Sequence, residues 1–218
     1  MATKAQLEER IEQIENDNRR LEQALNQVQL DLKSLDSNEQ QYSTPNSSIH
    51  ANEAIKRGLE EWSRVVVDPS ERINAYIKSV EGIGWTWEKD YVKNGQFAWC
   101  GAFAAFCYTK ARFNIRNKIF PSCYRLYSNW SNTSRKVKVE EVQPGDIVVV
   151  YTAKRSVQGD HITLCHSVDL KNRMIHTIEG NAKGTLGDES YGEGVIKQER
   201  SFDQVAHVYR LLGVDFDE

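Results

Sequence analysis

Proline, methionine and cysteine are scarce in this 218-residue chain, which has four, two and four of them. Four cysteines in a chain of this length do not make a disulfide framework. Cys107 lies seven residues after Cys100, on the same face of a predicted helix, which favours a packing role. Cys123 and Cys165 have no metal-ligand spacing around them. We therefore expect four reduced thiols and no metal.

The chain also has no apolar run of the length of a membrane helix. Its first residues do not lead into the apolar segment of a secretory signal. Residues 1–40 hold 5 basic against 9 acidic residues, and the remainder holds 23 against 22. Neither part has the basic excess of a nucleic-acid binder. We expect neither nucleic acid nor a membrane as a partner.

Apolar residues recur every three or four positions over residues 7–35, which predicts a coiled coil. Asn18 is the only polar residue of this stripe, and asparagine there favours two parallel strands. Leucines at the same heptad position favour a trimer as the alternative. A helix packed on its own domain usually has a wider apolar face. The stripe comprises Leu7, Ile11, Ile14, Asn18, Leu21, Leu25, Val28, Leu32 and Leu35.

The composition predicts three segments: a coiled-coil oligomerisation helix at 1–36, a linker at 37–50 and a folded domain at 51–218. The linker is rich in Ser, Asn, Gln and Thr, with little to bury. The domain opens with a helix over 52–64. A second helix runs from Pro69 to about Val80, with Asp68 as its cap.

The second half of the chain has the pattern of β-strands. Strands are expected over 147–151, 161–168, 174–179 and 205–212, with a turn at 169–173. Four glycines, at 184, 187, 192 and 194, indicate a mobile loop between the last two strands. Helices followed by antiparallel strands predict an α+β fold, with the helices packed on the sheet.

Cys100 lies where a loop ending at Phe97-Ala98-Trp99 enters a helix. Apolar residues at 100, 103, 104, 107 and 111 have helical spacing. The unpaired N–H groups and the dipole of a helix start favour an anion, and so a thiolate. Many free cysteines are instead inert core residues, and this segment alone leaves both interpretations open.

A hairpin turning near 170–171 places His161 opposite Glu179 or Asn181, on one face of the sheet with Thr163 and Cys165. One ring nitrogen of His161 is then held by a carboxylate or an amide, and the other is free for a neighbour. If the helix of Cys100 packs across this face, that neighbour is the thiol. Cysteine, base and orienting residue are the three parts of nucleophilic acyl transfer.

These residues, with Pro144-Gly145-Asp146 before an apolar strand and Glu179-Gly180-Asn181 eighteen residues after His161, resemble the CHAP family. This family comprises cysteine amidases and peptidases of the papain-like, NlpC-type group. The resemblance covers residues 80–212. It implies Cys100 as nucleophile, His161 as general base and Glu179 as the orienting residue, with Asn181 supporting the site or replacing Glu179. Gly101 departs from the alanine common at that position.

The resemblance implies hydrolysis of amide bonds in the peptides of bacterial cell walls, without a cofactor, as in phage lysins or secreted autolysins. A coiled coil stands where a wall-binding module would be expected. A protein made in the cytoplasm would then reach the wall after release or delivery by a phage, a virion or a secretion apparatus. The alternatives are a non-wall cysteine hydrolase or delivered toxin, and a non-catalytic coiled-coil adaptor.

Overall fold

The computed structural model describes residues 19, 20, 22, 26, 29, 45–68, 70–80, 98–109, 121–152, 156–186 and 189–212. The chain divides into two compact units, residues 1–41 and residues 42–218. The five described residues of the first unit are helical. The apolar stripe predicted over residues 7–35 lies outside the described residues, so the coiled coil stays a prediction.

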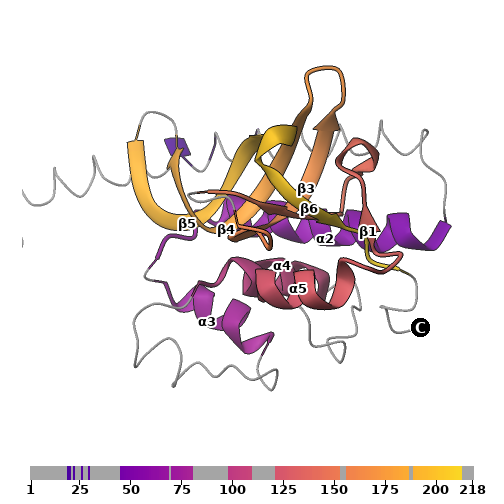
Figure 1. Cartoon of the computed structure of the whole chain (residues 1–218). Coiled ribbons are helices and arrows are strands. Elements are labelled where there is room, and N and C mark those ends of the chain that lie inside the picture. The colour runs from indigo at the N-terminus through magenta and orange to yellow at the C-terminus, as the bar shows by residue number, and fades with distance from the viewer. Residues whose placement is uncertain are drawn as a thin grey trace, which may run out of the picture. The chain divides into compact units, whose positions relative to one another are not determined.

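In the second unit, described helices pack on one side of an antiparallel sheet, which confirms the predicted α+β class (Figure 1). No helix in the described ranges is long and apolar enough to cross a membrane. The helices are α2 (Pro45–Ser63), α3 (Glu71–Lys78), α4 (Cys100–Thr109) and α5 (Cys123–Trp130).

Helix α2 begins at Pro45, inside the segment predicted to be a linker. Proline suits the first helical position because its missing N–H has no partner there in any case, and its fixed φ is close to the helical value. The predicted linker boundary at residue 50 is therefore wrong, and the polar composition of this segment does not prevent it from being helical.

Helix α3 is capped by Ser70 rather than by the predicted Asp68. The Ser70 hydroxyl accepts a hydrogen bond from the backbone N–H of Arg72 at 3.2 Å. Asp68 has a tertiary partner instead, because its carboxylate accepts a hydrogen bond from the indole N–H of Trp99 at 3.2 Å. This bond ties the segment before α3 to the residue that precedes Cys100.

The described strands form one sheet with the order β1-β6-β2-β3-β4-β5, and every neighbouring pair is antiparallel. The central strand β2 is buried along its whole length, in agreement with its apolar sequence. The strands are β1 (Lys136–Val137), β2 (Ile147–Val150), β3 (His161–Asp169), β4 (Met174–Leu186), β5 (Glu189–Ser201) and β6 (Val205–Tyr209).

The glycine-rich segment predicted to be a mobile loop is instead the end of β4 and the start of β5. Gly184 pairs with Tyr191, and Leu186 pairs with Glu189. Two irregularities in the register, between residues 179 and 182 and between 183 and 184, accommodate this segment. Strand β5 is therefore absent from the strands expected from the sequence, and so are the contacts that it makes with β4.

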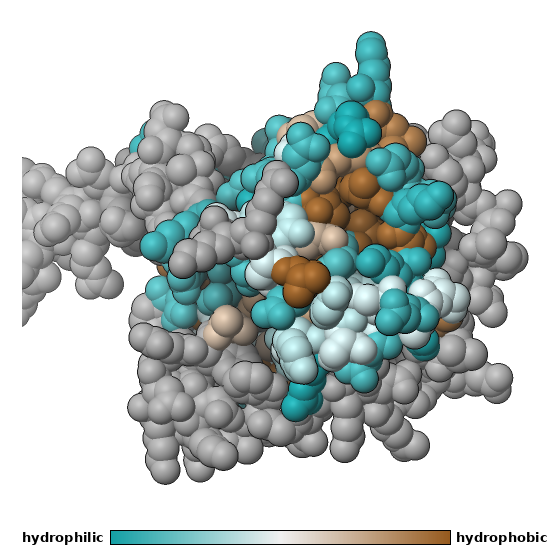
Figure 2. Space-filling model, in the orientation of Figure 1, coloured by the Kyte–Doolittle hydropathy of each residue, from teal (hydrophilic) through white to brown (hydrophobic). Residues whose placement is uncertain are grey.

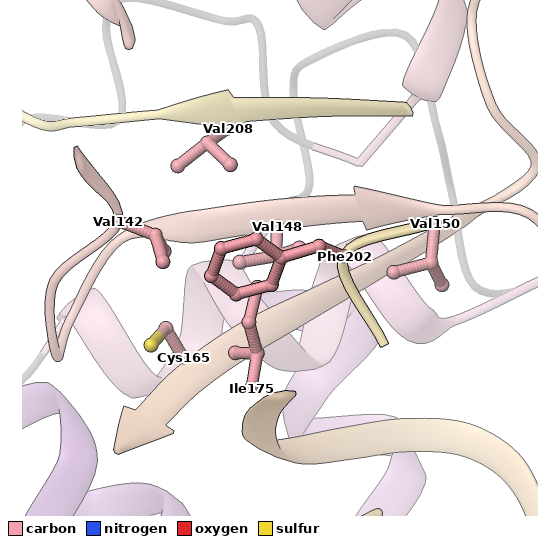
Figure 3. Packing of buried hydrophobic residues seen from close by; sticks show 7 residues of the cluster. All are labelled: Val142, Val148, Val150, Cys165, Ile175, Phe202 and Val208. Carbon is pink, nitrogen blue, oxygen red and sulfur yellow. The ribbon is translucent and has the colours of Figure 1, made fainter. Parts of the chain in front are cut away.

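The helices cover the face of the sheet that carries Leu164 and Ile178. A Cβ built on Gly58 of α2 would lie 3.1 Å from Ile178 and 3.5 Å from Leu164. The opposite face carries a second apolar cluster, shown in Figure 3, which contains Cys165 and is covered by Phe202 of the short 3-10 helix η4 (Phe202–Gln204). Hydrophobic residues over this part of the sheet reach the surface and are surrounded by hydrophilic ones (Figure 2).

Candidate active site

Cys100 is the first residue of α4, as the loop-to-helix pattern predicts. Its side chain is buried, and so is Trp99 before it. The first helical hydrogen bond runs from the N–H of Phe103 to the carbonyl of Trp99 at 2.9 Å. The N–H of Cys100 therefore belongs to the first turn, where no carbonyl four residues earlier serves as an intrahelical acceptor.

Glycine is required at position 101 because the backbone of Pro121 lies too close for a side chain. A Cβ built at this position would lie 2.4 Å from the Cα of Pro121 and 2.7 Å from its carbonyl carbon and oxygen. Real Cβ atoms do not approach backbone so closely. The departure from alanine noted in the sequence thus has a structural reason, because the segment before α5 lies directly against the start of α4.

His161 and Glu179 are joined by a hydrogen bond, so that of the two partners expected for the imidazole, Glu179 is the one in contact. The ring N–H at Nε2 of His161 donates to Oε2 of Glu179 at 3.0 Å, and both side chains are buried. The hairpin between them turns at residues 170–173 and pairs Leu164 with Ile178. A one-residue bulge between Cys165 and Ser167, which periodicity does not predict, shifts the register.

The thiol of Cys100 is a further hydrogen-bond partner of His161, and the charge of each side chain favours the opposite charge on the other. The predicted packing of the cysteine helix across the face of Thr163 and Cys165 is wrong, since Cys165 lies in the cluster on the other face. His161 contacts Cys100 nonetheless, because it is the first residue of β3 and lies at the edge of the sheet where the strand begins.

The pKa values of the four cysteines distinguish Cys100 from the others. Burial would raise the pKa of the Cys100 thiol, but the charge and hydrogen bond of His161, with the backbone N–H groups of Ile162 and Gly101, outweigh burial and lower it. Burial raises the pKa of Cys123 to about 12 and raises the pKa values of Cys107 and Cys165 as well. Among these thiols, only Cys100 is poised to ionise.

The imidazole of His161 is correspondingly stabilised in its charged form. Burial would lower its pKa, but the coupling to Cys100 and the hydrogen bond to Glu179 raise it to about 10. At pH values above the pKa of the thiol and below that of the imidazole, the pair exists as thiolate and imidazolium. A thiolate beside a proton donor is the arrangement that nucleophilic acyl transfer needs.

Glu179 is completely buried and makes three further hydrogen bonds that sequence reasoning did not find. Arg200 of β5 donates from Nε to Oε1 at 2.8 Å and from Nη2 to Oε2 at 2.6 Å, and the hydroxyl of Thr177 also donates to Oε1. Burial would raise the pKa of Glu179, but these partners and His161 lower it to about 2. The carboxylate is therefore ionised in spite of its burial.

The three residues of the Glu179-Gly180-Asn181 motif have three separate physical roles. Glu179 bonds to His161. A Cβ at Gly180 would lie 2.5 Å from Cβ of Phe103 and 2.7 Å from the ring of Trp99, so only glycine lets β4 approach α4. Asn181 has a φ of 59°, in the left-handed region that asparagine tolerates better than most residues.

Asn181 is the sequence-predicted site residue that the described contacts do not join to the others. Its side chain is half-buried, and within the described residues it makes no hydrogen bond to His161. Glu179 therefore occupies the orienting position beside the imidazole. The aromatic residues Trp85 and Trp87, between α3 and α4, lie outside the described residues.

Comparisons with known protein families, with curated proteins and with solved structures find no match. The site is therefore interpreted from its own chemistry. The described part of the chain holds no group of three or more His, Cys, Asp or Glu side chains that could bind a metal ion. What it brings together is a row of four side chains, the half-buried Arg200 and the buried Glu179, His161 and Cys100.

Proposed function

We propose that this protein is a cysteine hydrolase that cleaves amide bonds through a covalent acyl intermediate. The observation that carries the proposal is the continuous hydrogen-bonded row from Glu179 through His161 to Cys100, with the cysteine at a helix start. It supplies an activated nucleophile, a general base and an orienting carboxylate in one place.

The reaction begins with the thiol proton already held by His161, when the thiolate of Cys100 attacks the carbonyl carbon of an amide. The N–H of Cys100, in the first turn of α4, is positioned to stabilise the oxygen that becomes negative. The intermediate collapses by breaking the carbon–nitrogen bond, and His161 returns the proton to the leaving amine. Water, deprotonated by His161, then cleaves the thioester and releases a carboxylic acid.

The substrate class we propose is the peptide part of bacterial cell walls, as in the papain-like CHAP hydrolases that the motifs resemble. Support comes from the spacing of Cys100, His161 and Glu179-Gly180-Asn181, together with the contacts that explain each residue of that motif. The proposed setting is a lysin-like enzyme that reaches the wall after release or delivery. Its coiled coil at residues 7–35 would join two or three copies.

Incubation of the purified protein with purified cell walls tests the proposal, with new amino groups and the loss of turbidity as readouts. The wild type should release amino groups, and Cys100→Ala should release none while keeping the same unfolding temperature. Cys165→Ala is the matched control, because that buried thiol lies on the other face of the sheet and should keep most of the activity.

Two results would contradict parts of the proposal. Full release by Cys100→Ala would show that this cysteine is not the nucleophile. The wild type could instead release no amino groups although its Cys100 reacts rapidly with alkylating agents. That result would refute the wall substrate and would not contradict the hydrolase chemistry.

A further inference from the structure

Arg200 is a charged residue that hydrogen-bonds directly to Glu179 of the candidate site but is not one of the expected catalytic residues. It lies on β5 opposite Ile175 of β4. Its guanidinium meets both oxygens of Glu179, at 2.8 and 2.6 Å, in the two-pronged geometry that makes arginine–carboxylate pairs strong. Only 14% of the Arg200 side chain is exposed.

Two other buried carboxylates in the described residues have the same two-pronged arginine contact. Arg72 of α3 holds Glu61 of α2, and Arg210 after β6 holds Asp146 before β2. Each of those pairs ties two elements of the fold together. The pair at Glu179 differs because one of its carboxylate oxygens also accepts a hydrogen bond from a histidine that is bonded to a reduced cysteine.

We propose that Arg200 is a positioning residue of the active site, which acts through Glu179 to hold His161 in its charged, correctly oriented state beside Cys100. This inference rests on the proposed cysteine-hydrolase function and adds a fourth residue to the three that the sequence indicates.

Glu179 is held by hydrogen bonds at both of its carboxylate oxygens. Oε1 of Glu179 accepts from Arg200 and Thr177, and Oε2 accepts from Arg200 and His161. With both oxygens occupied in this way the carboxylate cannot rotate without breaking a hydrogen bond. The imidazole plane is thereby fixed, and the second ring nitrogen stays directed at the thiol.

Arg200 also stabilises the negative charge of Glu179. Burial is the largest influence on the pKa of Glu179 and opposes its charge, and the hydrogen bond from Arg200 is the largest influence in the other direction. Without Arg200, Glu179 would take up a proton more readily and would no longer support the imidazolium. With Arg200 present, charges alternate along the row from guanidinium to carboxylate, imidazolium and thiolate, so each charge has an opposite neighbour.

Other ionisable groups around this row are few among the described residues. His161 faces Glu179 from β3, and Arg200 faces it from β5. Asp160, exposed directly before β3, acts on Arg200 and favours its charged form. Cys123 at the start of α5 is influenced by the charge of Cys100. None of these groups replaces the guanidinium as a partner for the two oxygens of Glu179.

The test measures how fast iodoacetamide alkylates Cys100 as a function of pH, with the modified peptide quantified by mass spectrometry. This reaction needs no substrate. Arg200→Gln should slow alkylation by about tenfold at about pH 6, where the thiolate depends on the charged imidazole. It should change little at about pH 9, where Glu179 is ionised again without Arg200 and the imidazolium of His161 still carries its proton. Arg200→Lys should recover part of the loss, because a lysine keeps the charge but not the two-pronged contact.

The control is Arg210→Gln, which breaks the matched pair with Asp146 away from the site. It should lower the unfolding temperature and leave the pH profile of alkylation in place. A general loss of structure would slow or speed alkylation at every pH, and so a difference confined to low pH identifies a role in the site.

A double-mutant cycle decides whether Arg200 acts through Glu179. In a Glu179→Gln background, Arg200→Gln should have no further effect on alkylation at about pH 6, and this double variant has no unpaired buried charge that would prevent folding. An unchanged profile in Arg200→Gln, or an equal effect of Arg200→Gln in both backgrounds, would overturn the inference. A shifted profile in a protein inactive on walls would support it and refute only the wall substrate.

Discussion

The backbone of Pro121 lies so close to Gly101 that no side chain fits between them. The atoms concerned are a hypothetical Cβ at residue 101 and the Cα of Pro121, which would be 2.4 Å apart. Gly101 follows the candidate nucleophile, and Pro121 precedes α5 by two residues. Any substitution at 101 must therefore displace either the segment before α5 or the first turn of α4, which carries Cys100.

Gly101→Ala should consequently be costly in spite of the better helix propensity of alanine. Overpacking of this kind costs about 1–3 kcal/mol in the free energy of unfolding, and the displaced first turn should also reduce the reactivity of Cys100. Gly58→Ala is the matched control, because its new methyl group would meet side-chain atoms and no backbone, with Ile178 at 3.1 Å and Leu164 at 3.5 Å. Denaturant unfolding of both variants measures the two free energies. Equal stability of Gly101→Ala and Gly58→Ala would refute this account of the contact.

The four cysteines should differ sharply in their reactivity toward iodoacetamide. The pKa of Cys100 is lowered by His161, whereas burial raises those of Cys107, Cys123 and Cys165. Near neutral pH, alkylation should therefore modify Cys100 first, and the rate should stay nearly level until the imidazolium of His161 loses its proton at about pH 10. Peptide mapping by mass spectrometry after brief labelling gives the order of modification.

Faster modification of Cys123, which is the most exposed of the four, would mean that accessibility rather than ionisation governs the reaction. His161→Ala should remove the preference for Cys100, since it removes the group that lowers the pKa of that thiol.

Substitutions at Glu179 and Asn181 should separate a chemical role from a conformational one. Glu179→Gln should lower the rate of hydrolysis by about a hundredfold or more, since an amide stabilises an imidazolium poorly. Asn181→Gly should retain most of the rate, because glycine adopts a φ of 59° without strain. Asn181→Ala should lose about 1 kcal/mol of stability from the same backbone conformation. Equal loss of rate in the Gly and Ala variants would assign the Asn181 side chain a part in the chemistry.

The amino-terminal stripe over residues 7–35 should make the protein an oligomer. Apolar residues at strict heptad spacing leave water only when two or more such helices meet, and Asn18 favours two parallel strands. Because the flanking positions are mostly acidic, association should strengthen as salt screens their repulsion. Light scattering at micromolar concentration should show a dimer or trimer.

Deletion of residues 1–40 provides the matching control, since residues 42–218 form a compact unit of their own. The shortened protein should be monomeric and should still be alkylated at Cys100 with the full-length profile. A monomeric full-length protein would remove the coiled-coil prediction.

Sequence patterns of short range predicted much of this domain correctly. The helix beginning at Cys100, the buried strand after Asp146 and the hairpin between His161 and Glu179 all appear where periodicity and turn residues indicate them. Such features depend on residues close together in the chain, and local conformational preferences are visible in the sequence itself. Boundaries were less accurate, as at Pro45 and Ser70, because caps and first turns compete with tertiary partners such as the Trp99 bond of Asp68.

What the chain order did not show is which distant groups meet. Arg200 is 21 residues from Glu179, on a strand whose glycines are typical of a loop in the sequence. Only the β4–β5 pairing brings its guanidinium to the carboxylate. The sequence does not show why glycine is needed at 101 and 180. The reason is the close approach of Pro121 to Gly101 and of Phe103 to Gly180. Contacts of this kind have no sequence period, because packing of whole elements decides them. The amino acids alone determined the candidate nucleophile and base, and the tertiary structure decided what holds them in place.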